Sequence, residues 1–128
     1  MNAGAGLGWD LLKISGSLSI TSSASAPFSI QVASLDAADL SGSLVEFDPA
    51  ASYSWTFATA SGGITGFDAG DFVIDSSGFT NSHPGGGFSV SQEGNDLVVH
   101  YAVPEPSTAL LLTTAALGFL ARRRRRME

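Results

Sequence analysis

The chain has 128 residues, no cysteine and a formal net charge of −6. This length allows one modest domain, and the lack of cysteine excludes disulfides, a thiol nucleophile and a cysteine-ligated metal. Residues 1–103 hold ten acidic side chains against Lys13 alone, a net charge of −9, which excludes nucleic acid as a partner of this part.

Alternation of apolar and polar residues predicts strands in residues 9–20, 28–32, 44–47 and 53–57. Residues 36–42 read as a turn, and residues 64–75 as a loop that leads into a strand. Two further apolar runs, residues 88–92 and 97–103, flank a polar turn and predict a closing β-hairpin. Strands at this spacing predict an all-β body, either an antiparallel β-sandwich or a β-solenoid end. We find no second copy of any sequence period.

Three aromatic residues, Tyr53, Trp55 and Phe57, form the clearest period-2 stripe. A stripe at strand period is typical of a β core, and this is the interpretation we favour. The alternative is a stacking platform for sugar rings.

Three carboxylates, Asp68, Asp71 and Asp75, surround two glycines. Oxygen ligands on such a loop are chemically suited to Ca²⁺, but the spacing does not match an EF-hand loop. We interpret them as turn-capping residues, and we expect no metal site and no cofactor.

The two histidines, His83 and His100, carry no recognisable catalytic context. A serine hydrolase needs a histidine beside a placed carboxylate and an activated serine, and no Gly-x-Ser-x-Gly elbow occurs. Nothing marks a carboxylate pair for glycoside cleavage either. We therefore expect a protein that is not an enzyme.

The last residues combine three physically different pieces. Pro104, Glu105 and Pro106 form a stiff spacer, because proline fixes φ and lacks an N–H donor. Residues 107–121 form an uncharged apolar run rich in helix formers. Five consecutive arginines follow: Arg122, Arg123, Arg124, Arg125 and Arg126.

We interpret residues 107–121 as a single transmembrane helix. Its fifteen residues reach roughly 22 Å, short of a hydrocarbon core of roughly 30 Å, but arginine stems can snorkel and the bilayer can thin. The arginine tail, residues 122–128, would stop transfer on the cytoplasmic side and leave residues 1–103 outside. Two alternatives, a buried core helix and a polybasic nucleic-acid arm, explain the adjacent arginines and the acidic body less well.

The order Val-Pro-Glu-Pro-Ser-Thr, short apolar helix, arginine run and chain end resembles the PEP-CTERM sorting signal of bacteria. This resemblance implies processing by exosortase, a membrane-embedded cysteine protease or transpeptidase. By the same resemblance, Pro104, Glu105 and Pro106 would be the recognised element and residues 122–126 the cytoplasmic stop.

The body resembles, more weakly, the region before the tail in proteins built from autotransporter-associated β-strand repeats. The residues behind this likeness are 10–16, 53–55, 62–67 and 96–101. Residues 1–9 are uncharged and glycine-rich, unlike a secretory signal. We therefore expect either an export signal upstream or, as we favour, the C-terminal part of a longer protein.

Together, these features predict a non-enzymatic surface or extracellular-matrix protein that is anchored in the membrane and then processed to the cell surface or exterior. Its expected partners are an exosortase-type enzyme and the lipid bilayer. One alternative is a carbohydrate-binding or adhesive β module of the cell envelope, with an exopolysaccharide as a partner. Another is a polysaccharide-degrading enzyme with its active site in upstream sequence.

Overall fold

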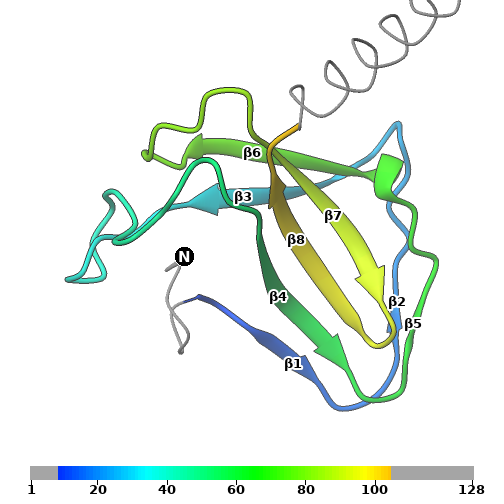
Figure 1. Cartoon of the computed structure of the whole chain (residues 1–128). Coiled ribbons are helices and arrows are strands. Elements are labelled where there is room, and N and C mark those ends of the chain that lie inside the picture. Colours follow the sequence, from blue (N-terminus) through cyan, green and yellow to red (C-terminus); the bar gives the residue numbers. More distant parts are fainter. Residues whose placement is uncertain (1–8, 105–128) are drawn as a thin grey trace, which may run out of the picture.

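The computed structural model describes residues 9–104, which form eight strands and one short 3₁₀ helix (Figure 1). The elements are β1 (Leu12–Ile14), β2 (Leu18–Ser19), β3 (Phe28–Ala33), β4 (Tyr53–Ala60), β5 (Ile64–Thr65), η1 (Ala69–Asp71), β6 (Phe72–Gly78), β7 (Gly87–Glu93) and β8 (Asp96–Ala102). The all-β prediction for the body is confirmed for these residues.

The first six strands form two turns of a parallel β-coil. Strands β1, β2 and β3 make the first turn and pair in parallel with β4, β5 and β6 of the second turn (Figure 1). Leu12 lies beside Ala58 and Leu18 beside Ile64, so both pairs join residues 46 positions apart. Coiled parallel pairing is the pattern of a solenoid, in which each turn contacts its neighbours.

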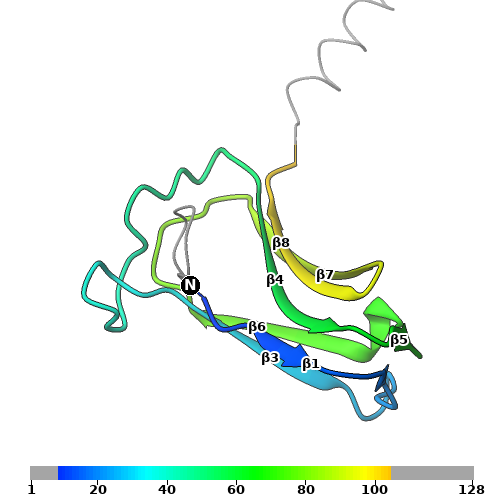
Figure 2. The same cartoon turned by 90° about the horizontal axis from the view of Figure 1, so that it is seen from below.

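An antiparallel hairpin closes the second turn. Strands β7 and β8 are joined through Gly94, whose φ of 62° suits a tight turn, and β8 also pairs antiparallel with β4. The resulting sheet has the order β1-β4-β8-β7. Figure 2 shows β4, β8 and β7 on one side of the molecule and β3 and β6 on the other, with β5 where the two layers meet.

The core fills the space between these layers. Trp55 on β4 and Val99 and Tyr101 on β8 pack with Val32 on β3 and with Phe79. A second cluster lies where the turns stack, around Ala58, Ala60, Ile64 and Leu97. Burial of apolar side chains in these two clusters is the main stabilising contribution to the fold.

Of the two architectures that the sequence allows, the parallel pairings match the β-solenoid end rather than an antiparallel sandwich. The predicted strand at 44–47 is wrong. Glu46 adopts a φ of 61°, which ends extended backbone, and Leu44 is bonded to the Asn81 side chain through both its N–H and its C=O. The sequence shows no second copy of any period, yet the strand pairing reveals two structural turns.

Within residues 9–104, no helix has the length and apolar character needed to cross a membrane. The predicted transmembrane helix, residues 107–121, lies outside the described residues.

Candidate functional site

The predicted sorting tail begins where the folded body ends. Strand β8 lies between β4 and β7 and ends at Ala102. The next residue, Val103, packs against the main core, whereas Pro104 is exposed. An exposed proline at this position fits the predicted spacer, because proline cannot donate to a strand ladder.

The rest of the predicted tail lies outside the described residues. This holds for Glu105 and Pro106 of the spacer and for the five arginines: Arg122, Arg123, Arg124, Arg125 and Arg126. Of the tail, the structure therefore places only Val103 and Pro104, the first two residues after β8 ends at Ala102.

The aromatic stripe is brought together on the core side of β4. Tyr53 and Trp55 stack with ring centroids 5.6 Å apart and an angle of 15° between their planes. Trp55 is only 3% exposed, and both Tyr53 and Phe57 pack against the same core. The middle ring of the stripe is thus covered, while Tyr53 and Phe57 are half-buried.

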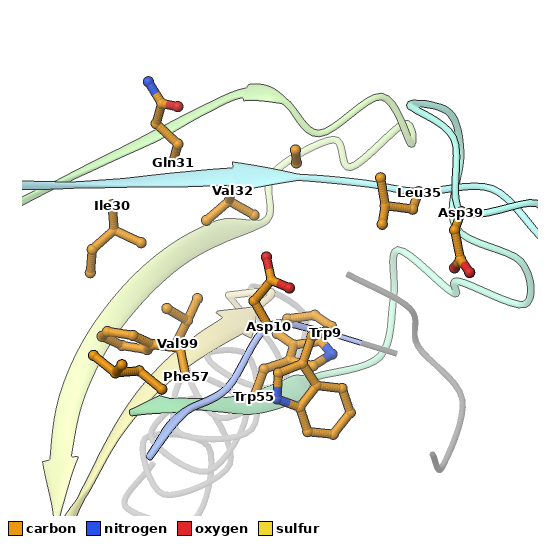
Figure 3. A pocket seen from close by; sticks show the side chains of 12 residues that line it. Trp9, Asp10, Ile30, Gln31, Val32, Leu35, Asp39, Trp55, Phe57 and Val99 are labelled. Carbon is orange, nitrogen blue, oxygen red and sulfur yellow. The ribbon is translucent and has the colours of Figure 1, made fainter. Parts of the chain in front are cut away.

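Two of these rings nevertheless line a cavity of about 600 Å³ inside the coil (Figure 3). Trp9, Trp55 and Phe57 supply aromatic surface and Asp10 and Asp39 supply carboxylates, while the Gln31 amide points away from the cavity on the far face of β3. The Trp9 indole N–H donates to the Thr56 carbonyl at 2.7 Å, which fixes that ring beside β4. The cavity thus combines flat apolar surface with a few hydrogen-bonding side chains.

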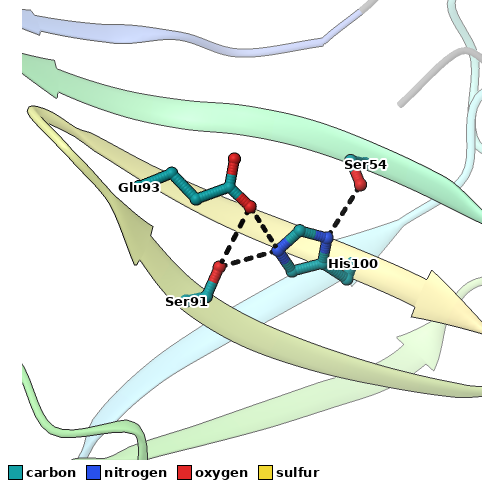
Figure 4. Close-up of polar contacts among 4 residues, drawn as sticks. All are labelled: Ser54, Ser91, Glu93 and His100. Atoms are coloured by element: carbon teal, nitrogen blue, oxygen red, sulfur yellow. Dashed lines mark hydrogen bonds and ion pairs between the residues drawn. The ribbon is translucent and has the colours of Figure 1, made fainter.

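A polar cluster that the sequence did not indicate lies on the opposite face of the same sheet (Figure 4). The His100 ring contacts the Ser54 hydroxyl through Nδ1 and the Ser91 hydroxyl through Nε2, each at 2.7 Å. Glu93 Oε1 lies 3.1 Å from the same Nε2. Strand pairing assembles the cluster, because Ser54 and Ser89 both lie opposite His100 in the ladder and Ser91 follows on β7.

The cluster contains the residue types of a hydrolytic triad but not its setting. Each imidazole nitrogen of His100 contacts a serine hydroxyl, and more than half of the Glu93 side chain is exposed to solvent. Ser54 and His100 alternate along their strands with Trp55 and Val99, so they face away from the cavity that those residues line. A catalytic serine requires a concave substrate site beside it. The second histidine, His83, packs against aromatic rings, and its Nδ1 lies 2.7 Å from the Asn81 carbonyl oxygen.

The three aspartates of the predicted loop act separately. Asp68 caps η1 by accepting a hydrogen bond of 2.8 Å from the Gly70 N–H. Asp75 accepts one of 2.9 Å from the Ser77 N–H, and this bond lowers the pKa of the Asp75 carboxyl. Among residues 9–104, no three His, Asp or Glu side chains lie close enough to hold a metal ion.

Comparison with known proteins identifies the tail. The family described as the PEP-CTERM protein-sorting motif matches residues 102–126, which confirms the resemblance of the tail. This motif indicates a substrate of an exosortase-type processing enzyme, and it implies membrane anchoring and secretion to the surface. No curated protein and no solved structure matches the chain.

Proposed function

We propose that the chain is a non-enzymatic surface or extracellular-matrix protein whose acidic β body is displayed outside the membrane. In this proposal, residues 107–121 hold the chain in the bilayer as a temporary transmembrane helix. Pro104, Glu105 and Pro106 then present the processing site, and the arginines keep the chain end on the cytoplasmic side.

The single observation that carries this proposal is the position of the sorting motif. The match begins at residue 102, the last residue of β8, so the whole fold precedes the motif. Processing near Pro104 would therefore remove no strand of the described body. An exposed Pro104 without a ladder position suits recognition as an extended segment.

The charge of the body supports display away from anionic surfaces. Residues 1–103 carry a net charge of −9, so they are repelled by anionic lipid headgroups and remain soluble once released. A released acidic body of this kind fits an extracellular matrix component.

The test compares processing of the parent chain and the double variant Pro104→Ala, Pro106→Ala in a bacterium that carries an exosortase. We expect the parent to convert to a shorter form and the variant to accumulate unprocessed in the membrane fraction. Pro84→Ala is the matched control, because Pro84 is exposed but lies outside the sorting motif at residues 102–126. Equal processing of parent and double variant would contradict the proposal.

The alternative function is carbohydrate binding, and the cavity is the observation that favours it. Trp9 and Phe57 supply aromatic surface on which a sugar ring could stack, and Asp10 and Asp39 supply carboxylates that bind hydroxyls. Calorimetric titration with neutral oligosaccharides tests this alternative. Binding that is lost in Asp10→Ala but kept in Gln31→Ala, with the fold intact, would support it, and absence of binding would contradict it.

A further inference from the structure

The first turn of the coil has an unpaired side. Strand β1 is the end strand of its sheet, and β2 and β3 each pair with one strand, which belongs to the second turn. Among residues 9–104, no strand lies on the other side of these three. We call this side the open edge, formed by Leu12–Ile14, Leu18–Ser19 and residues 28–32.

Hydrogen bonds show which backbone groups lie on the open edge. The Leu18 N–H donates to Gly63 O at 2.9 Å, and the Ile14 carbonyl accepts from the Ser61 N–H at 3.0 Å. Both residues thus direct their backbone groups toward the second turn. Because alternate residues of a strand point to opposite edges, the N–H groups of Lys13 and Ser19 lie on the open edge.

Two large apolar side chains of the first turn, Leu12 and Phe28, are exposed to solvent. Leu12 occupies the place that Ala58 occupies one turn later, yet Leu12 is 60% exposed and Ala58 only 2%. Likewise, Phe28 is 56% exposed and contacts its successor Phe72 edge to face. At these two positions the first turn is therefore apolar like the second turn but is exposed.

The cavity extends along the same turn. Leu12 on β1 and Ile30 and Val32 on β3 line it, together with Trp9, which directly precedes the coil (Figure 3). The inside of the coil is thus incompletely filled beside the first turn. A space of this size at the coil end leaves room for the inward side chains of a further turn, which would complete the close packing of the interior.

On the other side of the coil, β4 is covered, whereas β5 and β6 pair with no further strand of the described residues. Strand β8 pairs along β4, and the Ala60 N–H donates to the Asn95 carbonyl at 2.9 Å. The Gln92 side-chain amide donates to the Ile64 carbonyl of β5 at 3.3 Å. These contacts form a terminal cap of the kind that solenoids need at each end. The described structure thus has a partial cap after the second turn, over β4 and at Ile64 of β5, and no strand pairs with the first turn on its other side.

We propose that the open edge receives a further turn of parallel β-coil, supplied by polypeptide that precedes Trp9. Such a turn would pair with β1, β2 and β3 as these strands pair with β4, β5 and β6, and its inward side chains would fill the cavity. A second copy of the chain is disfavoured by the net charge of −9 on each body. A glycan in the cavity would leave the three strand edges unpaired.

The test is a chain in which residues 12–57 occur twice in tandem within the full sequence. The added copy then precedes Leu12 with the same 46-residue spacing that separates Leu12 from Ala58. We expect one cooperative urea transition with an m-value about 1.5-fold that of the parent, because m scales with the surface exposed on unfolding. We also expect the amides of Lys13 and Ser19 in the original copy to exchange at least about tenfold more slowly.

Proline substitution of these two edge residues provides the matched control. In the parent chain, Lys13→Pro with Ser19→Pro should leave the fold intact, because proline is tolerated where an N–H faces away from the ladder. In the tandem chain the same pair should abolish the rise in m-value, whereas Lys13→Thr with Ser19→Thr, which keep both donors, should preserve it.

A second tandem chain tests whether bulk at the junction matters. Its added copy carries alanine at positions 12 and 14, as the second turn does at Ala58 and Ala60. If the added turn stays unfolded in both tandem chains, with unchanged exchange at Lys13 and Ser19, the proposal is overturned. It is also overturned if the parent chain forms a dimer in analytical ultracentrifugation that the two proline substitutions dissociate.

Discussion

The hydroxyl of Tyr101 donates a hydrogen bond of 2.9 Å to the carbonyl oxygen of Pro49, a residue 52 positions earlier. The Tyr101 ring is fully buried at the centre of the aromatic core, where it contacts Phe47 and Phe88. This bond ties the loop before β4 to the last strand of the fold. Burial raises the pKa of the Tyr101 phenol, with the nearby Tyr53 and Asp48 as smaller causes.

Alkaline pH should therefore weaken the fold through Tyr101. The raised pKa means that the folded state favours the neutral phenol, so its contribution is complete below the unfolded pKa of about 10. The contribution is lost as the pH rises through the folded pKa. Urea unfolding between about pH 9 and about pH 11 should show falling stability in the parent chain and a flatter profile in Tyr101→Phe.

Tyr53→Phe serves as the control, because Tyr53 is the other tyrosine of the chain. This variant should keep the alkaline loss that Tyr101 causes. At neutral pH, Tyr101→Phe should lower the free energy of unfolding by about 1 kcal/mol for the lost hydrogen bond. A profile in Tyr101→Phe as steep as that of the parent would contradict this account.

Two neighbouring glycines should respond very differently to alanine. A Cβ at Gly86 would overlap with the Tyr101 hydroxyl and ring, whereas a Cβ at Gly87 would meet no atom within 4 Å. Neither residue has a positive φ, so the difference arises from packing alone. Thermal or urea unfolding should show a loss of about 1–3 kcal/mol for Gly86→Ala and a change within about 0.5 kcal/mol for Gly87→Ala.

Equal effects at the two glycines would show that the loop does not pack against Tyr101 as described. In that case the buried position of the Tyr101 hydroxyl would also be in question.

The polar cluster on the outer face should be structural rather than catalytic. We expect a fluorophosphonate probe, which labels activated serines, to leave both Ser54 and Ser91 unmodified, because the face that carries them is opposite the cavity. His100→Ala should lower the free energy of unfolding by about 1 kcal/mol, since partly exposed hydrogen bonds contribute little. Labelling of either serine that is lost in His100→Ala would contradict the non-enzymatic proposal.

Orientation in the membrane should depend on the five arginines. Replacing residues 122–126 by serine should reduce retention of the chain end on the cytoplasmic side, because clustered Lys and Arg set topology. Protease protection of an epitope placed at the chain end measures this orientation in spheroplasts. Replacement by lysine should preserve the parent pattern, and an unchanged pattern in the serine variant would refute the stop role.

Much of the body could be predicted from local patterns. The closing hairpin and the strand at 53–57 were correct because both alternate at period 2 and are bounded by turn residues. The strand at 44–47 was not correct. Its short apolar run resembles a strand, but side-chain bonds from Asn81, distant in sequence, and the left-handed Glu46 decide its conformation.

The two-turn coil had a weak signal in the sequence. Ser15-Gly16 recurs as Ser61-Gly62, and the Phe-x-Ile of residues 28–30 recurs at residues 72–74. The stacked registers place both pairs one turn apart. So few matched residues, most of them small, do not stand out without knowledge of the period.

The sorting tail and the His100 cluster also differ in how far the sequence alone could predict them. The sorting tail is a linear motif, so its order along the chain was enough to recognise it. The cluster around His100 depends on strand register, which brings Ser54 beside a residue 46 positions away. No local pattern specifies such a register before the fold is known.

The most direct test of the sorting account is the intact mass of the mature protein, isolated from a cell that carries an exosortase. The account predicts a C-terminus close to Pro104, with residues 107–128 removed and β8 complete. A mature protein that retains the apolar run and all five arginines would contradict it.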